Sequence, residues 1–418
     1  MTVRANQIAG LTAAIADIRP LERPADQLLH LFFRRRPAIG QADRVFIADG
    51  VFAYLRRRRS LEALAASQDP SHLALAVAVR EMGFGLRELS AALTERDAIW
   101  VRAFKSRLAT ELAPAVAADV PDWLWSRLGE IYSDGERIDL TRAWLRAAPL
   151  DLRINPLATT RDAARSALEA SGIAAEPTPY SPLGLRVSGR PSLARHPLFV
   201  EGAIEVQDEG SQLVGYLVAP KRSEMVVDFC AGAGGKTLLL GALMRSQGRL
   251  YAFDSHDKRL ANLNPRLKRS GLSNVYPQLI ASERDTKIKR LAGKIDRVLV
   301  DAPCTGFGTL RRNPDLKWRQ SEPGVNELAA KQRAILAAAS TLLKPGGRLV
   351  YATCSVLEDE NEAIVEEFLE AHRDFAAGDA TAELARAGIL LDTGPTLKLL
   401  PHIHGCDGFY AALLQRNR

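Results

Sequence analysis

The chain has 418 residues, 47% of them hydrophobic, and a formal net charge of +7, so it is long enough for two or three separate cores. It contains no run approaching 18 uncharged apolar residues, and its start, MTVRANQIAG, lacks the apolar centre of a signal peptide, so we expect a cytoplasmic protein with no membrane partner. The four cysteines lie far apart without a C-x-x-C pair or clustered histidines, which argues against a disulfide framework and a metal site.

Residues 1–140 are predicted to form a helical domain. Apolar residues recur there at three- and four-residue spacing, as in FIADGVFAYL and LEALAA, and few β-branched runs interrupt them. The runs FRRRP and LRRRRS place seven arginines near two predicted helix ends, at Arg34–Arg36 and Arg56–Arg59. These arginines either bind RNA phosphates or are solvated surface charges, and the sequence leaves both interpretations open.

Residues 141–205 differ from the preceding residues in their sequence pattern and are predicted to form a small α+β linking module. Short apolar pieces (LDLRINPL, GLRVSG) alternate with one helical stretch, TRDAARSALEASG, and with many prolines.

Residues 206–418 alternate between predicted strands and helices. The strands are EMVVDFC, LYAFD, NVYPQL, DRVLVD and GRLVYAT, and helices are expected from Gly235, from about Asp257, around 325–341 and from about Glu358. This order predicts a mostly parallel sheet covered by helices on both faces, as in Rossmann-like α/β domains. Within this part, residues 241–350 hold 21 Lys and Arg against 9 Asp and Glu, which would suit a phosphate-rich partner or merely a solubilising surface.

The first of these strands runs into DFCAGAGGKT (Asp228–Thr237), whose glycines let a ligand approach the backbone between strand and helix. The spacing fits neither a nucleotide-phosphate loop, which needs Gly where Cys230 stands, nor a dinucleotide fingerprint, which needs Gly at Thr237. Asp254 ends the second strand, where a carboxylate can accept hydrogen bonds from ribose hydroxyls or can simply cap a helix. Together these features favour S-adenosylmethionine as cofactor.

Five ordered motifs in residues 141–418 resemble those of the Sun-type (Fmu-type, Nop/Sun) RNA 5-cytosine methyltransferases. They are QDEGSQL (Gln207–Leu213), DFCAGAGGKT, DAPCTGFGTLRRNPDLKW (Asp301–Trp318), LKPGGRLVYATCS (Leu343–Ser355) and DGFYAA (Asp407–Ala412). The N-terminal RVFIADGVFAYLRRR also resembles the NusB-like RNA-binding domain of bacterial ribosomal-RNA members. The resemblance thus implies a multi-domain protein: an all-α NusB-like domain (1–140), a small α+β, RRM-like module (141–205) and an α/β Rossmann-like methyltransferase domain (206–418).

The chemistry of such an enzyme explains why two cysteines are needed. Carbon 5 of cytosine is a poor nucleophile until a thiolate adds to carbon 6, and the adduct must later break down with help from a second group. The resemblance makes Cys354 of the TC motif the nucleophile and Cys304 of the PC motif the residue that assists product release. Each cysteine follows a parallel strand, so both should face one pocket, and a helix from about Glu358 could favour the Cys354 thiolate. Cys230 and Cys406 are interpreted as small buried hydrophobes.

The remaining site residues are carried over from the family in the same way. Asp301 is expected to hydrogen-bond the cytosine, and Lys236 to reach the cofactor or the target base. The expected cofactor-binding residues are Asp228, Cys230, Ala231, Gly232, Ala233, Gly234, Gly235, Lys236, Asp254, Arg259 and Asp301. Arg259 and Lys317 could equally be surface charges.

One departure from the family concerns the adenine. Where an aspartate is usual after the third strand, this chain has Ala281 and Ser282, so Glu283, Asp285 or backbone groups would have to serve.

The sequence therefore predicts a monomeric, metal-independent RNA cytosine-5 methyltransferase that uses S-adenosylmethionine and acts on 16S (small-subunit) ribosomal RNA. A transfer-RNA methyltransferase of the same chemistry, and a non-catalytic RNA-binding or assembly protein, are the alternatives. A DNA cytosine methyltransferase fits less well, because it would make the PC cysteine the nucleophile and leave ATCS unexplained.

Overall fold

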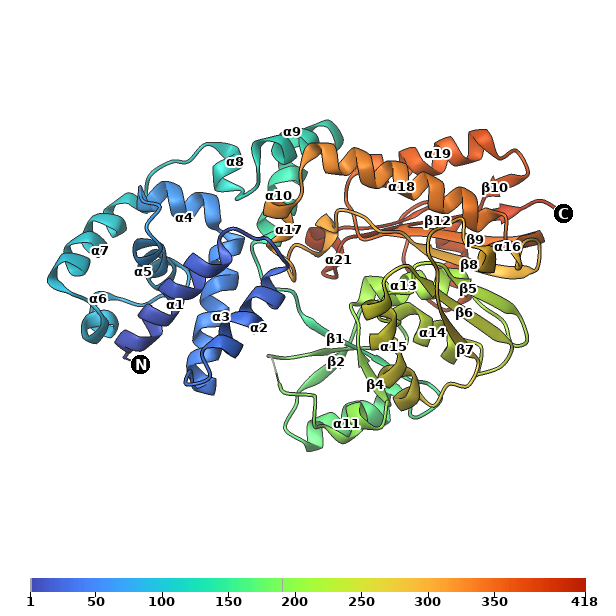
Figure 1. Cartoon of the computed structure of the whole chain (residues 1–418), viewed down its shortest axis with the longest axis horizontal. Coiled ribbons are helices and arrows are strands. Elements are labelled where there is room, and N and C mark those ends of the chain that lie inside the picture. Colours follow the sequence, from blue (N-terminus) through green and yellow to red (C-terminus); the bar gives the residue numbers. More distant parts are fainter. Residues whose placement is uncertain (1, 190) are drawn as a thin grey trace. The chain divides into compact units, whose positions relative to one another are not determined.

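The computed structural model describes residues 2–189 and 191–418 and is drawn in Figure 1. Its chain forms two compact units. Residues 1–147 and 310–322 make up the first unit, and residues 148–309 and 323–418 the second. The three-part division at residues 140 and 205 stays a prediction. Its second and third parts both lie in the second unit, except for residues 141–147 and 310–322.

The first unit is helical, as the apolar periodicity of residues 1–140 predicts. Its helices are α1 (Ala5–Ile18), α2 (Ala25–Arg35), α3 (Gln41–Arg56), α4 (Arg58–Ala65), α5 (Pro70–Arg80), α6 (Leu86–Leu89), α7 (Glu95–Arg107), α8 (Pro114–Ala117), α9 (Asp122–Ile131), α10 (Asp134–Trp144) and α17 (Leu316–Arg319). The apolar faces of α1, α3 and α5 meet in one core, which includes Leu11, Val51 and Val77, all without exposed surface. Burial of these stripes stabilises helices that would be marginal alone.

The segment Leu310–Glu322 is part of this helical unit although it belongs to a motif of the methyltransferase family. Trp318 packs against the helical core and its indole N–H donates to the carbonyl of Leu55 at 2.7 Å. Lys317 is 1% exposed and donates through Nζ to the carbonyl of Arg56 at 2.7 Å. Lys317 is therefore no surface charge.

Arginines 56–59 each form a hydrogen bond or ion pair within the same unit. Arg57 pairs with Glu81 and Arg58 with Glu62, while Arg59 reaches both the carboxylate of Asp122 and the carbonyl of Val120. Arg56 donates to the carbonyl of Arg311 at 3.0 Å. These four arginines are thus partly buried and have partners within the unit, whereas Arg34 and Arg35 at the end of α2 are exposed.

The second unit begins with a four-stranded antiparallel sheet in the order β2-β3-β1-β4. The elements are β1 (Leu150–Ile154), α11 (Arg161–Ala170), β2 (Ala175–Pro177), β3 (Gly184–Val187), α12 (Pro197–Val200) and β4 (Ile204–Val206). Leu152, Leu168 and Leu185 form the centre of its core, so α11 covers one face of the sheet, as expected of a small α+β module.

The remainder of the second unit is built on a mixed sheet in the order β10-β12-β9-β8-β5-β6-β7, with β11 paired to β12. Its strands are β5 (Met225–Asp228), β6 (Arg249–Asp254), β7 (Val275–Leu279), β8 (Ile295–Asp301), β9 (Leu343–Thr353), β10 (Phe375–Ala377), β11 (Leu397–Leu399) and β12 (Phe409–Arg416). The strands from β9 to β7 pair in parallel, and β12 adds antiparallel to β9. The Rossmann-like expectation is confirmed.

Helices cover both faces of this sheet, as Figure 1 shows. They are α13 (Glu209–Val218), α14 (Gly235–Leu243), α15 (Asp257–Ser270), α16 (Thr286–Lys289), α18 (Glu322–Ser340), α19 (Glu362–Ala371), α20 (Ala380–Arg386) and α21 (Pro401–His404). Residues of α13, α14 and α15 share one core, whereas α16, α18 and α19 share the other. The inner parallel strands β5, β8 and β9 are largely buried on both faces, so polar side chains gather at their carboxyl ends and in the loops that follow.

No helix in the described part of the chain is both long and apolar enough to span a bilayer.

Candidate functional site

A pocket of about 680 Å³ lies at the carboxyl ends of β5, β6, β7, β8 and β9, within the roughly 300–1,000 Å³ typical of small-molecule sites. It collects nearly every residue that the sequence nominated. Those that line it are Asp228, Cys230, Ala231, Gly232, Ala233, Gly235, Lys236, Asp254, Arg259, Asp301, Cys304 and Cys354. Gly234 does not line the pocket.

The glycine loop after β5 needs its glycines for backbone reasons. Gly232 and Gly234 have φ angles of 56° and 85°, in the left-handed region that favours glycine. A Cβ on Gly234 would also lie 2.1 Å from a methyl carbon of Leu263. Gly234 therefore sets the conformation of the loop on the side that faces Leu263, while its neighbours Ala233 and Gly235 line the pocket.

Asp254 fixes the loop as well as lining the pocket. Its two carboxylate oxygens accept the backbone N–H of Gly232 at 2.8 Å and that of His256 at 2.7 Å. Each oxygen keeps a second lone pair for a ligand hydroxyl. The side chain is 7% exposed, so this acceptor faces the pocket from a nearly buried position.

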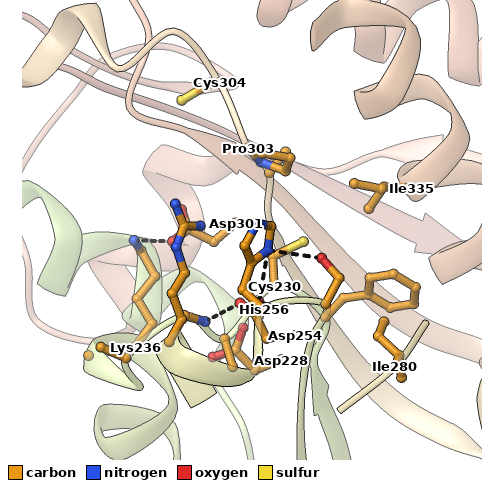
Figure 2. A pocket seen from close by; sticks show the side chains of 18 of the residues that line it. Asp228, Cys230, Lys236, Asp254, His256, Ile280, Asp301, Pro303, Cys304 and Ile335 are labelled. Atoms are coloured by element: carbon orange, nitrogen blue, oxygen red, sulfur yellow. Dashed lines mark hydrogen bonds and ion pairs between the residues drawn. The ribbon is translucent and has the colours of Figure 1, made fainter. Parts of the chain in front are cut away.

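Asp228 is a buried carboxyl at the base of the pocket (Figure 2). Burial raises its pKa to about 7, against the opposing effect of a 2.7 Å hydrogen bond donated by Thr237. Its other oxygen, Oδ1, has no hydrogen-bond partner among the residues that the structure describes. A buried acceptor left without a partner is costly, which favours a ligand donor at this point.

Lys236 and Asp301 form an ion pair on the pocket wall, with 2.7 Å between Nζ and Oδ2 (Figure 2). Burial lowers the pKa of Lys236, but the charge of Asp301 and its hydrogen bond outweigh burial, so the pKa is raised overall. A negative charge at Cys354 would favour the charged form of Lys236 further. The lysine thus supplies a positive charge that is paired with Asp301 and also interacts with Cys354.

The two nominated cysteines meet, with 3.4 Å between the sulfurs of Cys304 and Cys354. Cys304 lies in the loop after β8 and Cys354 directly after β9, and the N–H of Gly308 ties the first loop to the carbonyl of Cys354 at 2.8 Å. The hydrogen bond with Cys354 and then burial raise the pKa of Cys304 well above its usual value. Cys304 is therefore a thiol at neutral pH.

The helix expected from about Glu358 is α19, which begins at Glu362, and the residues before it form a single 3-10 turn, Glu358–Glu360. A turn of three acidic residues is too short and too negative to favour a thiolate at Cys354 through its dipole. The positive charge near that sulfur comes from Lys236.

The other two cysteines are placed differently. Cys230 lines the pocket, and burial raises its pKa well above the usual value. Cys406 has no exposed surface and packs in the core shared with α13 and α14.

The QDEGSQL motif, quoted above without a role, holds the glycine loop to the small α+β module. Gln207 lines the pocket and accepts from Arg153, which also donates to the carbonyl of Gly235 at 2.6 Å. Arg266 donates to the carbonyl of Ala233 at 2.6 Å and pairs with Glu205. These contacts join residues 33 to 82 positions apart, so spacing alone could not have found them.

The loop after β7 lies where the family places its aspartate. Ala281, Ser282 and Glu283 line the pocket. Asp285 is instead occupied by the N–H groups of Ala281 and Lys287, at 2.8 and 2.9 Å, and caps α16. Of the two acids considered as substitutes, only Glu283 faces the pocket. Arg259 lies exposed at its edge.

Across residues 2–189 and 191–418, no group of three or more His, Cys, Asp or Glu side chains is arranged to hold a metal ion.

Two family models match the chain: one described as 16S rRNA methyltransferase RsmB/F over residues 215–415, and one described as "Methyltr_RsmF/B-like, ferredoxin-like domain" over residues 120–193. The chain is 36% identical over 71% of its length to the probable ribosomal RNA small subunit methyltransferase B of Synechocystis sp., and it spans 66% of that relative, slightly less than two thirds. It is 34% identical over 75% of its length to ribosomal RNA small subunit methyltransferase B of Sodalis glossinidius, covering 70% of it.

Among solved structures, the crystal structure of PH0851 superposes with a TM-score of 0.79 and 26% identity, covering 100% of both chains.

Proposed function

Because the chain belongs to the 16S rRNA methyltransferase RsmB/F family, we propose that it transfers a methyl group from S-adenosylmethionine to carbon 5 of a cytosine in small-subunit ribosomal RNA. The observation that carries this proposal is the meeting of Cys304 and Cys354, 3.4 Å apart, in the pocket that also contains the glycine loop and Asp254. Carbon-5 methylation of cytosine requires a covalent thiol adduct, and a methyl donor must lie beside it.

The pocket suits S-adenosylmethionine by the chemistry of its wall. Asp254 offers carboxylate oxygens to ribose hydroxyls, and the unpartnered Oδ1 of Asp228 suits an ammonium donor. Ile280 and Ala281 add apolar surface near Ser282 and Glu283, where the adenine would lie. The cofactor, when bound, supplies a methyl group on a positively charged sulfur.

The two thiols divide the remaining chemistry between them. Cys354, as thiolate, adds to carbon 6 of the cytosine, and the electrons of the carbon 5–carbon 6 bond make carbon 5 nucleophilic. After methylation the proton on carbon 5 passes to water, its bonding electrons restore the double bond, and the carbon 6–sulfur electron pair returns to Cys354. Cys304, a thiol 3.4 Å away, donates a hydrogen bond to that sulfur as its negative charge develops.

Lys236 and Asp301 complete the reaction site. Asp301 hydrogen-bonds the amino group or ring of the cytosine, and Lys236 fixes the position of the Asp301 carboxyl through the 2.7 Å contact. The lysine also interacts electrostatically with Cys354, and its charge balances the negative charge of the attacking sulfur.

The choice of ribosomal RNA rests on the relatives' names and on the NusB-like resemblance of the first unit. We assign RNA binding to that unit, with Arg34 and Arg35 at the end of α2 as exposed candidates for phosphate contacts.

Replacing each cysteine by alanine tests the assignment of the two thiols. Cys354→Ala should form no covalent bond to RNA, because no thiol is placed to attack. Cys304→Ala should attack and methylate but release slowly, so an adduct that survives denaturing gel electrophoresis should accumulate when cofactor and substrate RNA are supplied. The reverse pattern would mean that Cys304 is the nucleophile.

Two further measurements address substrate and cofactor. Bisulfite sequencing of total RNA from cells with and without the gene should reveal a methylated cytosine in small-subunit ribosomal RNA, and a change confined to transfer RNA would make the latter the substrate. Titration calorimetry should detect S-adenosylmethionine binding, and no heat at millimolar cofactor would favour a non-catalytic RNA-binding protein.

A further inference from the structure

Glu360 is a buried carboxylate whose hydrogen-bond donors are all uncharged. It has no exposed surface and lies at the end of the 3-10 turn after the Cys354 loop. Its Oε1 accepts from the backbone N–H of Thr305 at 2.8 Å and from Nε2 of Gln332 at 3.1 Å, and its Oε2 accepts from the hydroxyl of Thr305 at 2.6 Å. Burying a carboxylate without a cation costs free energy, and these hydrogen bonds offset part of that cost.

These hydrogen bonds fix the residues beside both reactive cysteines. Thr305 directly follows Cys304, and Ser355 directly follows Cys354. Ser355 also hydrogen-bonds the Glu360 carboxylate, and its hydroxyl lies 3.2 Å from that of Thr305. One carboxylate therefore joins the two cysteine loops, although it touches neither sulfur.

The anchoring extends to the other side of Cys304 and to the turn itself. Gln332 of α18 donates to the carbonyl of Pro303 at 2.9 Å as well as to Glu360, so the residues before and after Cys304 are both held. The hydroxyl of Tyr351, on β9, donates to the backbone carbonyl of Glu360 at 2.6 Å. This hydrogen bond fixes the turn to the strand that ends just before Cys354.

Glu360 also acts on Cys304 through its charge. After the hydrogen bond with Cys354, burial and the charge of Cys354 itself, the negative charge of Glu360 further raises the pKa of Cys304. The carboxylate thus disfavours a thiolate at Cys304 and leaves it as the hydrogen-bond donor to the other sulfur.

We propose that Glu360 is a positioning residue that holds Cys304, as a thiol, against the sulfur of Cys354, and so serves product release rather than attack. This inference rests on the proposed function, because it assigns Glu360 to one step of that reaction.

The test compares Glu360→Gln and Thr305→Val with Glu358→Gln, an exposed glutamate on the same turn. Thr305→Val removes one hydroxyl at constant shape, so it reports on the contact even where Glu360→Gln folds poorly. Each protein is given S-adenosylmethionine and small-subunit ribosomal RNA from cells lacking the gene. Methyl transfer in a single turnover, steady-state kcat, covalent adduct on denaturing gels and cofactor Kd are measured.

For Glu360→Gln and Thr305→Val we expect single-turnover methyl transfer within about threefold of the wild type, a kcat lower by roughly 10-fold or more, accumulated adduct and unchanged cofactor Kd. Glu358→Gln should match the wild type throughout. A purely structural Glu360 would instead slow attack and release equally and weaken cofactor binding, and this result would overturn the inference.

The wild-type reaction separates the two ways of failing. If the wild type is active and the Glu360→Gln and Thr305→Val variants turn over equally well and accumulate no adduct, the role of Glu360 alone is refuted. A folded wild type that methylates no cytosine refutes the proposed function, and the role of Glu360 with it.

Discussion

Lys236 in the pocket of the second unit and Lys317 in the core of the first are both buried lysines, but burial leaves them in opposite states. Lys236 lies 2.7 Å from the carboxylate of Asp301, and its pKa is raised. Lys317 donates to a backbone carbonyl, and burial lowers its pKa to about 7 although the charge of Asp119 opposes the shift. A carboxylate in direct contact offsets the desolvation of an ammonium group, and a carbonyl dipole does not.

The same comparison distinguishes two roles within one sequence motif. Cys304 and Lys317 belong to DAPCTGFGTLRRNPDLKW, but Cys304 lines the pocket of the second unit and Lys317 anchors the segment in the first. Only the residue that faces the cavity can meet a ligand. Charge buried in the core of the first unit therefore bears on stability alone, whereas charge buried at the pocket also bears on chemistry.

The largest effect should follow from removing the paired lysine. Lys236→Met leaves Asp301 without its cation and Cys354 without nearby positive charge, so kcat should fall by about 100-fold or more. Steady-state methyl transfer to RNA measures this, with exposed Lys289→Met as the control. A Lys236→Met enzyme with wild-type kcat would reduce the pair to a structural contact.

Asp228 gives a prediction about pH. Its folded-state pKa of about 7 exceeds the ordinary 3.8, because burial disfavours the carboxylate. The folded state therefore holds a proton that the unfolded state releases, and stability should fall as pH rises from about 4 to 7, by on the order of 1 kcal/mol per pH unit. Asp228→Asn should flatten this slope in thermal unfolding, whereas exposed Asp257→Asn should not. An unchanged slope in Asp228→Asn would contradict the assignment.

Lys317 should show the opposite sign. Its folded-state pKa of about 7 lies below the ordinary 10.5, so the unfolded state binds the proton more tightly between these values and stability should rise with pH there. Lys317→Met should remove the rise and stabilise the first unit at pH 7 by about 1 kcal/mol. Calorimetric Tm values from pH 7 to 9.5 test this, beside exposed Lys105→Met. Destabilisation at pH 7 would mean that the hydrogen bond to Arg56 outweighs desolvation.

The smallest effect concerns the paired arginines of the first unit, Arg56–Arg59. Arg59→Ser removes an ion pair with Asp122, whose side chain is 79% exposed, so it should cost about 0.2–1 kcal/mol. The salt dependence of RNA affinity should stay unchanged, since Arg59 is occupied within the unit. A slope of log affinity against log salt lower by about one would instead identify Arg59 as a phosphate contact.

The sequence predicted the local features of the pocket well, because these depend on the needs of short backbone segments. The glycines of DFCAGAGGKT predicted a turn between strand and helix that a ligand can approach, and the structure has that turn, with left-handed backbone angles at Gly232 and Gly234. Asp254 ends one parallel strand and each of the two cysteines follows another, so strand assignment alone places them at one edge of the sheet. The helix expected from about Glu358 is present as α19, but it begins at Glu362, because the chain first forms a 3-10 turn that buries Glu360.

Only the tertiary structure decided which partners those residues have. Lys317 reaches the carbonyl of a residue 261 positions away, and Thr305 meets a glutamate 55 positions further on. Periodicity reports which face of an element is buried, but not which distant residue it is buried against. Sequence by itself thus determined the sheet, the glycine loop and the family's thiols. Packing between distant segments determined the partners of Arg56, Arg57 and Arg59. It also determined that Lys236 is paired while Lys317 is not, and that Glu360 joins the two thiol loops. A buried charge takes its state from neighbours that the chain brings together only on folding.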